Sequence, residues 1–241
     1  MQAVILAGGK GTRLRPYTTV LPKPLMPVGD YPILEIILRQ LKRADVTRVV
    51  LAVGYMSHLF EAFFQDGQRY GLEISYSFET EALGTAGPLG AIVDALDEDF
   101  LVLNGDLLTT FSYRNVFAHH KRVDAAATIG AFRRSVDIDF GVLDIAADGT
   151  LVNYIEKPTY SFDVSMGINV LNAEAVRPYI TPGVHLDLPT LMKQLSRDGH
   201  RVSCYREECR WLDIGRLDDY QAAEEIFAAS RDEFLPSHVD R

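Results

Sequence analysis

The beginning of the chain constrains the fold more than any other stretch. An uninterrupted apolar run at residues 3–7 gives way to the glycine-rich segment 8–11. Such a run predicts a buried strand whose carboxyl end opens into a backbone loop. Because glycine has no Cβ, several N–H groups of that loop can point at one anion. Cationic side chains stand in and just after the loop: Lys10, Arg13, Arg15 and Lys23. The segment predicts a polyphosphate-binding loop, and a tight turn is the simpler alternative.

Two familiar phosphate-binding patterns do not fit this loop. A Walker loop needs Ser or Thr after the lysine, whereas Gly11 follows Lys10 here. A dinucleotide fingerprint needs a third glycine where this chain has Leu14, and no suitable acidic residue ends a second strand. What remains in residues 8–27 is Gly-Gly-x-Gly-Thr-Arg-Leu-x-Pro followed by Lys-Pro-x-x-Pro.

Composition excludes several classes of protein. A net charge of −9 over 241 residues argues against a nucleic-acid or anionic-membrane surface. No stretch approaches the ~18 to 20 apolar residues of a membrane span, and we expect the N-terminus to be a core strand, not a signal peptide. We expect Cys204 and Cys209 to be reduced, structural residues of a cytoplasmic protein. The histidines show no spacing that would bind a metal.

The first half of the chain alternates between strand and helix patterns. Residues 31–43 carry Pro32 in a first helical turn and apolar side chains at helical spacing. The predicted elements that follow are a strand at 47–53, a helix at 57–64 capped by Ser57, a strand at 72–78, a helix at 86–96 and a strand at 100–106. This order predicts an α/β, Rossmann-like fold: a mixed, mostly parallel sheet flanked by helices.

The second half contains more strand-like runs. We expect strands at 124–132, 140–145, 151–155, 164–171, 202–205 and 211–214, a hairpin turn at Asp148-Gly149, and helices at 187–195 and 217–227. No linker separates the halves. The prediction is therefore one domain over residues 1–230, with a nucleotide half (about 1–123) and a sugar half (about 124–230) sharing a sheet. Residues 231–241 are expected to form a tail.

The pattern in residues 8–27 resembles the signature of the sugar-phosphate nucleotidylyltransferases, or nucleoside-diphosphate-sugar pyrophosphorylases. The resemblance extends from Ala3 to about Ala228. It implies a GT-A-like fold and an enzyme that transfers a nucleoside monophosphate from an NTP to a sugar 1-phosphate, releasing pyrophosphate by direct in-line displacement. Positive groups and Mg²⁺ would carry much of the catalysis, because two polyanions must be brought together.

Two strand-end aspartates are candidate magnesium ligands. Asp106 ends the predicted strand at 100–106, and Asp213 ends the short strand near the C-terminus. Carboxylates at the carboxyl edge of an α/β sheet suit Mg²⁺, which prefers hard oxygen ligands. A cap or turn role is the alternative for each. By resemblance, Asp106 matches the aspartate of a Gly-Asp motif and Asp213 that of a Trp-x-Asp-x-Gly motif, which hold the metal between the phosphates.

The resemblance also implies roles for the loop residues. Arg13 would grip the triphosphate, and Lys23, rigidly held between two prolines, would contact the phosphates near the reacting centre. With Asp106, they form the expected catalytic set. The implied nucleotide-binding residues are Leu6, Ala7, Gly8, Gly9, Gly11, Thr12, Arg13, Glu79, Leu83, Gly84, Thr85 and Gly105.

The second half supplies the implied sugar-phosphate site. Glu156 and Lys157 match a motif whose glutamate takes sugar hydroxyls and whose lysine takes the sugar phosphate, although a Glu-Lys pair alone is more often solvated surface. Gly141 and Asn169 match positions that line the sugar pocket in relatives.

The segment 79–87 is the expected base-reading loop. Its Leu-Gly-Thr-Ala-Gly sequence looks like that of guanylyltransferases, and its small residues leave room for a purine, so GTP is favoured. A uridylyl-, thymidylyl- or cytidylyltransferase and a non-catalytic sugar-nucleotide-binding protein remain alternatives. We expect a short form without a C-terminal β-helix, similar to enzymes acting on mannose or heptose 1-phosphates. Its partners would be an NTP and a sugar 1-phosphate, not nucleic acid or a membrane, and it could form a homodimer.

Overall fold

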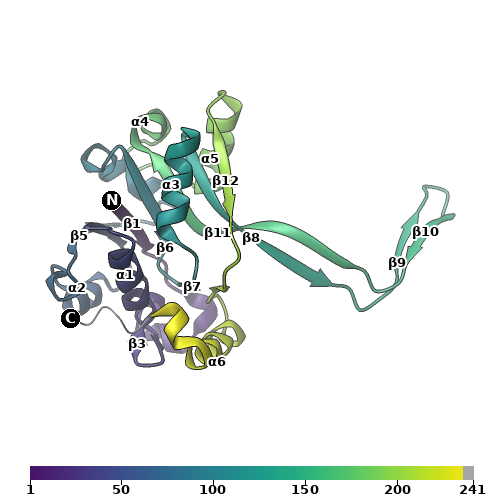
Figure 1. Ribbon diagram of the computed structural model, residues 1–241, viewed down its shortest axis with the longest axis horizontal. Coiled ribbons are helices and arrows are strands. Elements are labelled where there is room, and N and C mark those ends of the chain that lie inside the picture. The colour runs from purple at the N-terminus through teal and green to yellow at the C-terminus, as the bar shows by residue number, and fades with distance from the viewer. Residues whose placement is uncertain (236–241) are drawn as a thin grey trace.

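A seven-stranded sheet organises the protein (Figure 1). The structure is a computed structural model and describes residues 1–235. The strands lie in the order β12-β8-β11-β6-β1-β4-β5. Their bounds are β1 (Gln2–Ala7), β4 (Arg48–Val53), β5 (Glu73–Phe78), β6 (Asp99–Asn104), β8 (Ala127–Asp137), β11 (Thr159–Asn172) and β12 (Val202–Arg206). Only β11 runs antiparallel to its neighbours, β6 and β8. The prediction of a mixed, mostly parallel sheet is confirmed.

Strand β1 lies inside the sheet, parallel to both β4 and β6. Its consecutive residues Ala3, Val4 and Ile5 are all fully buried, as expected for a parallel strand that is covered on both faces. Because Leu6 pairs with Asn104 of β6, the two strands end side by side. The glycine loop after β1 and the Gly105-Asp106 turn after β6 therefore leave the sheet at the same edge.

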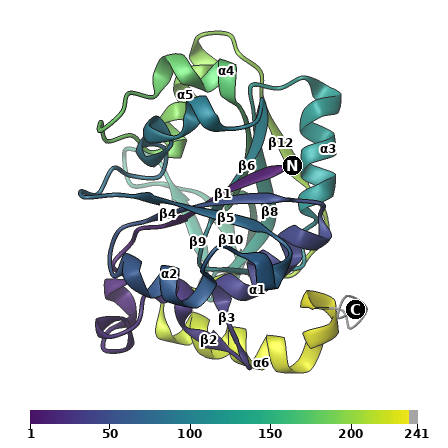
Figure 2. The ribbon, with the colours of Figure 1, turned by 90° about the vertical axis from the view of Figure 1, so that its left-hand side faces the viewer.

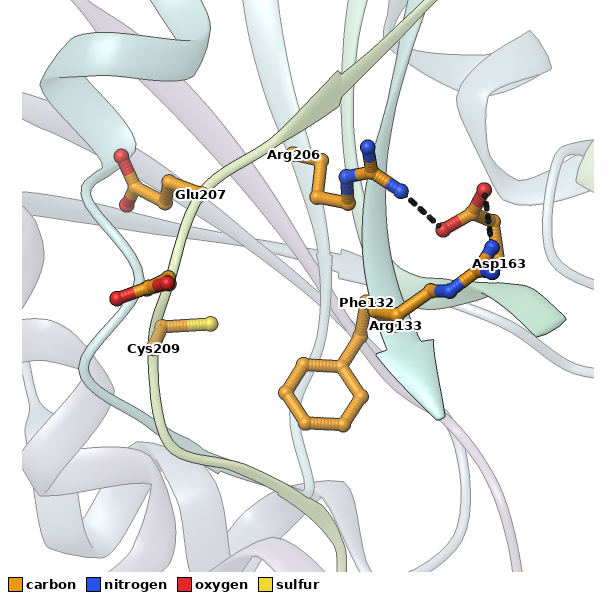
Figure 3. Close-up of a pocket in the computed structure, with 7 residues that line it drawn as sticks. Phe132, Arg133, Asp163, Arg206, Glu207 and Cys209 are labelled. Carbon is orange, nitrogen blue, oxygen red and sulfur yellow. Dashed lines mark hydrogen bonds and ion pairs between the residues drawn. The ribbon is translucent and has the colours of Figure 1, made fainter. Parts of the chain in front are cut away.

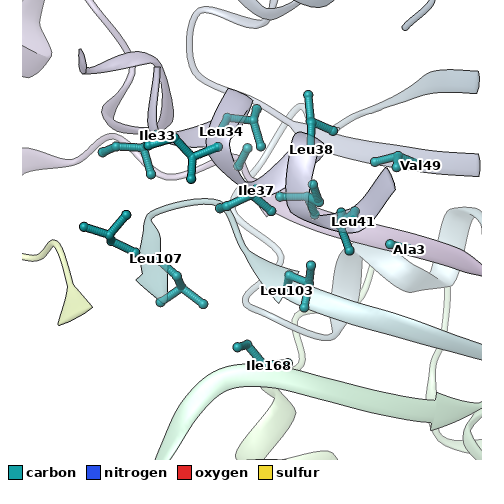
Figure 4. Close-up of a cluster of buried hydrophobic side chains, with 14 of the residues drawn as sticks. Ala3, Ile33, Leu34, Ile37, Leu38, Leu41, Val49, Leu103, Leu107 and Ile168 are labelled. Atoms are coloured by element: carbon teal, nitrogen blue, oxygen red, sulfur yellow. The ribbon is translucent and has the colours of Figure 1, made fainter. Parts of the chain in front are cut away.

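Helices cover both faces of the sheet (Figure 2). The helices are α1 (Ile33–Arg43), α2 (Ser57–Phe64), α3 (Tyr113–Val123), α4 (Ala173–Val176), α5 (Leu188–Arg197) and α6 (Leu217–Phe234). Helices α1, α2 and α6 contribute to one hydrophobic cluster, and α4 and α5 contribute to another on the opposite face. Figure 4 shows α1 packed on β1, β6 and β11 within the first cluster.

Short elements connect these units. They are the 3₁₀ turns η1 (Thr12–Leu14), η2 (Tyr17–Thr19), η3 (Lys23–Leu25), η4 (Gln68–Tyr70), η5 (Gly87–Ala91), η6 (Val93–Ala95) and η7 (Arg177–Tyr179), and the strand pairs β2 (Pro27–Val28) with β3 (Tyr31–Pro32) and β7 (Leu107–Thr109) with β13 (Trp211–Asp213). None of the helices in residues 1–235 combines the length and apolar character needed to cross a membrane.

The predicted elements agree with the structure except at a few places. The apolar stripe of the helix at residues 31–43 is confirmed as a buried face of α1. The helix expected at 86–96 is wrong: it is the pair of 3₁₀ turns η5 and η6. Glycines and Pro88 in this segment disfavour an α-helix. Ser57 begins α2 without capping it, since Met56 takes the cap position and no side chain caps the helix. Helix α3 was not predicted.

Strands β8 and β11 are longer than predicted and leave the globular part as a two-stranded projection (Figure 1). Its tip is a second hairpin, β9 (Val142–Ile145) with β10 (Leu151–Ile155). The hairpin turn predicted at Asp148-Gly149 is confirmed, with Gly149 at φ 86°. We call residues 133–163 the arm and the other described residues the body.

The C-terminal helix is also longer than predicted. Helix α6 continues past a kink at Ser230 to Phe234, whose side chain is 1% exposed and lies 5.8 Å from the ring of Phe227. The expectation of a tail is therefore wrong for residues 231–235, because a buried aromatic residue anchors them to the core. Residues 236–241 lie outside the described part of the chain.

We predict that Phe234→Ala lowers the free energy of unfolding by about 3 kcal/mol, because it leaves a cavity beside Phe227. Urea unfolding followed by circular dichroism measures the change. Glu225→Ala, an exposed position on the same helix, should change stability by less than about 0.5 kcal/mol. Equal stability of Phe234→Ala and the unmodified protein would show that Phe234 does not anchor residues 231–235 to the core.

Candidate active site

A cavity of about 470 Å³ opens at the carboxyl edge of β1 and β6. Its walls contain all but one of the predicted nucleotide-binding residues, together with Lys23 and Asp106. The exception is Gly105, whose N–H donates to the carbonyl oxygen of Leu6 at 3.0 Å and which supports the strand ends instead. Three wall residues were not predicted individually: Pro24, Asn104 and Ala82, the last of which lies within the predicted loop at 79–87. Asn104 could have been found, because it ends a buried strand just before the Gly-Asp pair.

The glycine loop takes its shape from Gly11. This residue has φ 58°, and a Cβ on it would lie 3.0 Å from Cγ2 of Thr18. The Thr18 hydroxyl donates to the Gly11 carbonyl at 2.8 Å, which ties the two turns of the loop together. Leu14 is buried as an anchor, while Arg13 remains exposed. The loop is thus held by its apolar and hydroxyl side chains, and its cations are free to reach an anion.

Lys23 lies between two carboxylates. Its ammonium group donates a hydrogen bond to Oδ2 of Asp106 and lies 3.8 Å from Oδ1 of Asp213. The lysine is 7% exposed, and these two carboxylates offset the free-energy cost of burying its positive charge. Pro22 and Pro24 flank it in η3 and restrict its backbone. The structure therefore brings Arg13, Lys23, Asp106 and Asp213 to one place.

The second carboxylate reaches this place through the pairing of β7 with β13. Asp213 is opposite Leu107, the residue after Asp106, and the N–H of Ile214 donates to the Asp106 carbonyl at 3.2 Å. Ile214 is fully buried, which fixes β13 to the body. Two aspartates more than a hundred residues apart thus become neighbours through backbone pairing.

The two aspartates fit a divalent cation. Oδ1 of Asp106 is buried and has no hydrogen-bond partner within the described residues. Burial, and next the negative charge of Asp106, raise the pKa of Asp213, while Lys23 and Arg13 oppose the rise. A cation would give Oδ1 of Asp106 a partner, and its positive charge would favour the ionised form of Asp213. No group of three or more His, Cys, Asp or Glu side chains within residues 1–235 could hold a metal. Phosphate oxygens and waters would thus complete a magnesium shell.

A second loop, at residues 82–85, lines the same cavity as the glycine loop. The N–H of Thr85 donates to Oδ1 of Asp187 at 3.1 Å, and the Thr85 hydroxyl accepts from the N–H of Leu188 at 2.8 Å. Gly84 has φ 78°, and a Cβ there would lie 2.6 Å from the Leu186 carbonyl oxygen. Burial raises the pKa of the cavity residue Glu79. The anchoring role of Asp187 was missed, since the sequence indicated only a helix start.

The predicted sugar-phosphate residues do not lie in this cavity. Glu156 and Lys157 are exposed on the arm. They lie between the far end of the β8–β11 ladder and the β9–β10 hairpin at the tip. Gly141 lies at the tip, where a Cβ would come 2.3 Å from the Tyr154 hydroxyl. Only Asn169 belongs to the body: it pairs with Val102 of β6 and is 4% exposed. Within one copy of the chain, the expected sugar site is therefore not assembled, and the roles of these residues stay a prediction.

We predict that Gly11→Ala destabilises the protein by about 1–2 kcal/mol, because the left-handed backbone disfavours a Cβ and Thr18 crowds it. Gly9→Ala in the same loop is the matched control, since a Cβ there meets nothing within 4 Å. Thermal unfolding of both variants checks the difference. Equal melting temperatures would contradict the strained role of Gly11.

The raised pKa of Asp213 predicts a pH-dependent cost in stability. The folded state holds the Asp213 proton more tightly than the unfolded chain does. Ionisation therefore destabilises the fold, by an amount that is absent below the unfolded aspartate pKa of about 3.9 and complete above the raised folded pKa. We expect Asp213→Asn to raise the melting temperature at pH 7.5 by about 1–3 °C, since half of the side chain is exposed. The gain should disappear near pH 4; an equal gain at both pH values would contradict this account.

Comparison with known proteins identifies relatives over nearly the whole chain. A profile of the family described as nucleotidyl transferase matches residues 2–230. UTP–glucose-1-phosphate uridylyltransferase of Synechocystis is 32% identical, over 92% of this chain and 62% of that protein. Mannose-1-phosphate guanyltransferase of Saccharomyces cerevisiae is 31% identical, over 95% of this chain and 65% of that protein. The chain thus spans less than two thirds of the length of these relatives.

Solved structures share the fold. A Bacillus anthracis protein assigned as a glucose-1-phosphate thymidylyltransferase, crystallised with a sucrose, superposes with a TM-score of 0.76 at 26% identity, over 97% of this chain and 99% of that one. HddC from Yersinia pseudotuberculosis complexed with GMP-PN gives a TM-score of 0.72 at 23% identity, over 94% of this chain and 99% of that one. On the family match and these relatives, the chain belongs to the nucleotidyl transferase family.

Proposed function

We propose that this protein transfers a nucleoside monophosphate from an NTP to a sugar 1-phosphate. A phosphate oxygen of the sugar 1-phosphate attacks the α-phosphorus; a new P–O bond forms, the bond between the α- and β-phosphates breaks, and pyrophosphate leaves. No covalent intermediate is needed. The one observation that carries the proposal is the position of Lys23, buried between Asp106 and Asp213 beside a glycine loop.

The residues around the cavity suit an in-line displacement. The backbone N–H groups of the glycine loop and the exposed side chain of Arg13 can neutralise a triphosphate that lies along η1. The ammonium group of Lys23 is held near the two carboxylates. It can stabilise the negative charge that develops on the leaving pyrophosphate. Asp106 and Asp213 would hold Mg²⁺, which would supply positive charge to stabilise the negative charge that develops on the phosphates.

We propose GTP as the favoured nucleotide. The loop at residues 82–87 contains several small residues and is anchored to the segment before α5, so it can form a firm wall for a purine. Glu79 lines the same cavity, and its carboxylate can accept hydrogen bonds from the N–H groups of guanine. Glu79→Gln should reduce the preference for GTP over the other NTPs. Uridylyl-, thymidylyl- and cytidylyltransfer are the alternatives, since relatives with different bases are about equally similar.

A non-catalytic sugar-nucleotide-binding protein is a further alternative. Loss of Arg13, Lys23 or an acidic metal ligand would favour it, and this chain retains all of them. We place the reaction in the cytoplasm, a reducing compartment that suits the free thiols of Cys204 and Cys209.

Pyrophosphate release with Mg²⁺ tests the function directly. The four NTPs and dTTP are assayed against mannose, glucose, glucosamine and heptose 1-phosphates. We expect GTP with one sugar 1-phosphate to be the best pair. Activity with another NTP would support the proposed reaction and overturn the assignment of guanine as the base. Binding of nucleotide sugars without pyrophosphate release from any pair would favour the non-catalytic alternative.

We predict that Asp106→Asn lowers turnover by at least ~100-fold, because the cation that would stabilise the charge on the phosphates loses a carboxylate ligand. Single-turnover pyrophosphate release measures the chemical step, and circular dichroism verifies the fold. Asp30→Asn, at an exposed turn, should retain near-full activity. A near-full rate for Asp106→Asn would remove this residue from the metal site.

A further inference from the structure

The arm carries an apolar surface that none of the described residues of the same copy covers. Ten of the sixteen exposed large hydrophobic residues within the described chain lie at residues 136–162. They are Val136, Phe140, Leu143, Ile145, Leu151, Val152, Tyr154, Ile155, Tyr160 and Phe162. A two-stranded ribbon is at best marginally stable alone in water, and a large exposed apolar surface marks an interface. The arm therefore needs a partner surface.

The arm is built to stay extended. Strands β8 and β11 pair without interruption from Ala131↔Ser165 to Asp137↔Thr159. At ~3.3 Å per residue, this ladder places its far end about 20 Å beyond Ala131. At its root, Asp163 accepts from Arg133 at 3.3 Å and from Arg206 of β12 at 2.8 Å, which joins three strands (Figure 3). Folding back onto the same copy's cavity would break this ladder, whereas reaching a second copy would not.

The body, in turn, has an unfilled surface beside the nucleotide cavity. A second cavity of about 530 Å³ is lined by Asp213, Trp211 and Phe132 of the body and by Arg134 at the root of the arm, among others. Arg13 lines both cavities. A substrate here would lie next to the two carboxylates and to Lys23. Yet Glu156 and Lys157, the side chains expected to hold a sugar phosphate, lie on the arm.

The outer part of the arm and the glycine loop of the body carry opposite charges. Beyond the ladder's midpoint, the arm carries Asp137, Asp139, Asp144, Asp148 and Glu156 against a single lysine, Lys157. The glycine loop of the body carries exposed cations: Lys10, Arg13 and Arg15. An acidic apolar tip suits a basic rim. A second copy of the same chain supplies that rim together with a free arm, in a closed two-fold arrangement.

We propose that two copies of this chain exchange arms, and that each arm completes the partner's active site with Glu156 and Lys157. The partner's Lys157 meets the phosphate of the sugar 1-phosphate, and the partner's Glu156 meets its hydroxyls, in the cavity beside Arg13 and Asp213. This inference rests on the proposed function. It explains why the sugar-binding residues of one copy are so far from its own nucleotide cavity.

Complementation between two inactive variants tests the exchange. Asp106→Asn inactivates the body, and the double variant Glu156→Gln, Lys157→Ala inactivates the arm. The two are co-expressed with different tags, and the mixed dimers are isolated by both tags. Exchange predicts about half of the unmodified activity per dimer, because one site receives an intact body and an intact arm. Each variant alone should be at least ~100-fold less active.

The outcomes separate the two proposals. Inactive mixed dimers made from two inactive variants would overturn the exchange and favour arm closure within one copy. If the double variant Glu156→Gln, Lys157→Ala is active while Asp106→Asn is inactive, the arm has no role in catalysis and the proposed function stands. Activity of Asp106→Asn alone would overturn the metal site itself. A mass equal to one chain of 26.9 kDa in sedimentation equilibrium would overturn the exchange independently of activity.

A variant of the apolar tip provides a second measurement. We expect Phe140→Ser, Ile145→Ser, Val152→Ser to form a folded monomer, since these side chains are exposed in a single copy and contribute little to the body's stability. Turnover should fall at least 10-fold while nucleotide binding in the body remains. A dimer of unchanged mass and activity would show that the tip is not the interface.

Discussion

The burial of β1 on both faces is the constraint on which the rest of the structure depends. Because no face of Ala3, Val4 and Ile5 reaches water, β1 lies inside the sheet, between two parallel strands. A central parallel strand ends beside its neighbours. The pairing of β1 with β6 therefore brings the glycine loop and Asp106 together. The crevice outside the carboxyl ends of such strands is where ligands of open α/β sheets bind.

Electrostatic compensation then determines how the crevice is arranged. Lys23 is buried with Asp106 and Asp213 as its counter-charges, and Oδ1 of Asp106 has no hydrogen-bond partner in the described part of the chain. An arrangement with a raised pKa at Asp213 and an unsatisfied oxygen is not optimal for stability, which is typical of sites that await a charged ligand. The short β7–β13 pairing maintains it, because a buried Ile214 fixes the strand on which Asp213 lies.

The second half of the chain contributes to the sheet and also leaves it. β11 pairs with β6 in the body and continues along β8 into the arm, so one strand connects the nucleotide cavity to Glu156 and Lys157. The first and second halves of the chain are therefore continuous at the sheet, although Glu156 and Lys157 lie outside the cavity within one copy. An exchange of arms would reconcile the two, because the two-fold axis returns the missing side chains to a body of the same sequence.

The sequence by itself determined the fold class, the α1 core stripe and most of the cavity residues. These features depend on local patterns: apolar periodicity, glycines after a strand and carboxylates at strand ends. Tertiary structure alone decided the anchoring of the second loop by Asp187, the burial of Phe234 and the extension of the arm. These features depend on contacts between distant residues, which no local pattern records. The arm shows this most clearly: alternating apolar residues predict its strands, but whether they pack on their own body or project from it depends on pairing that only the folded chain reveals.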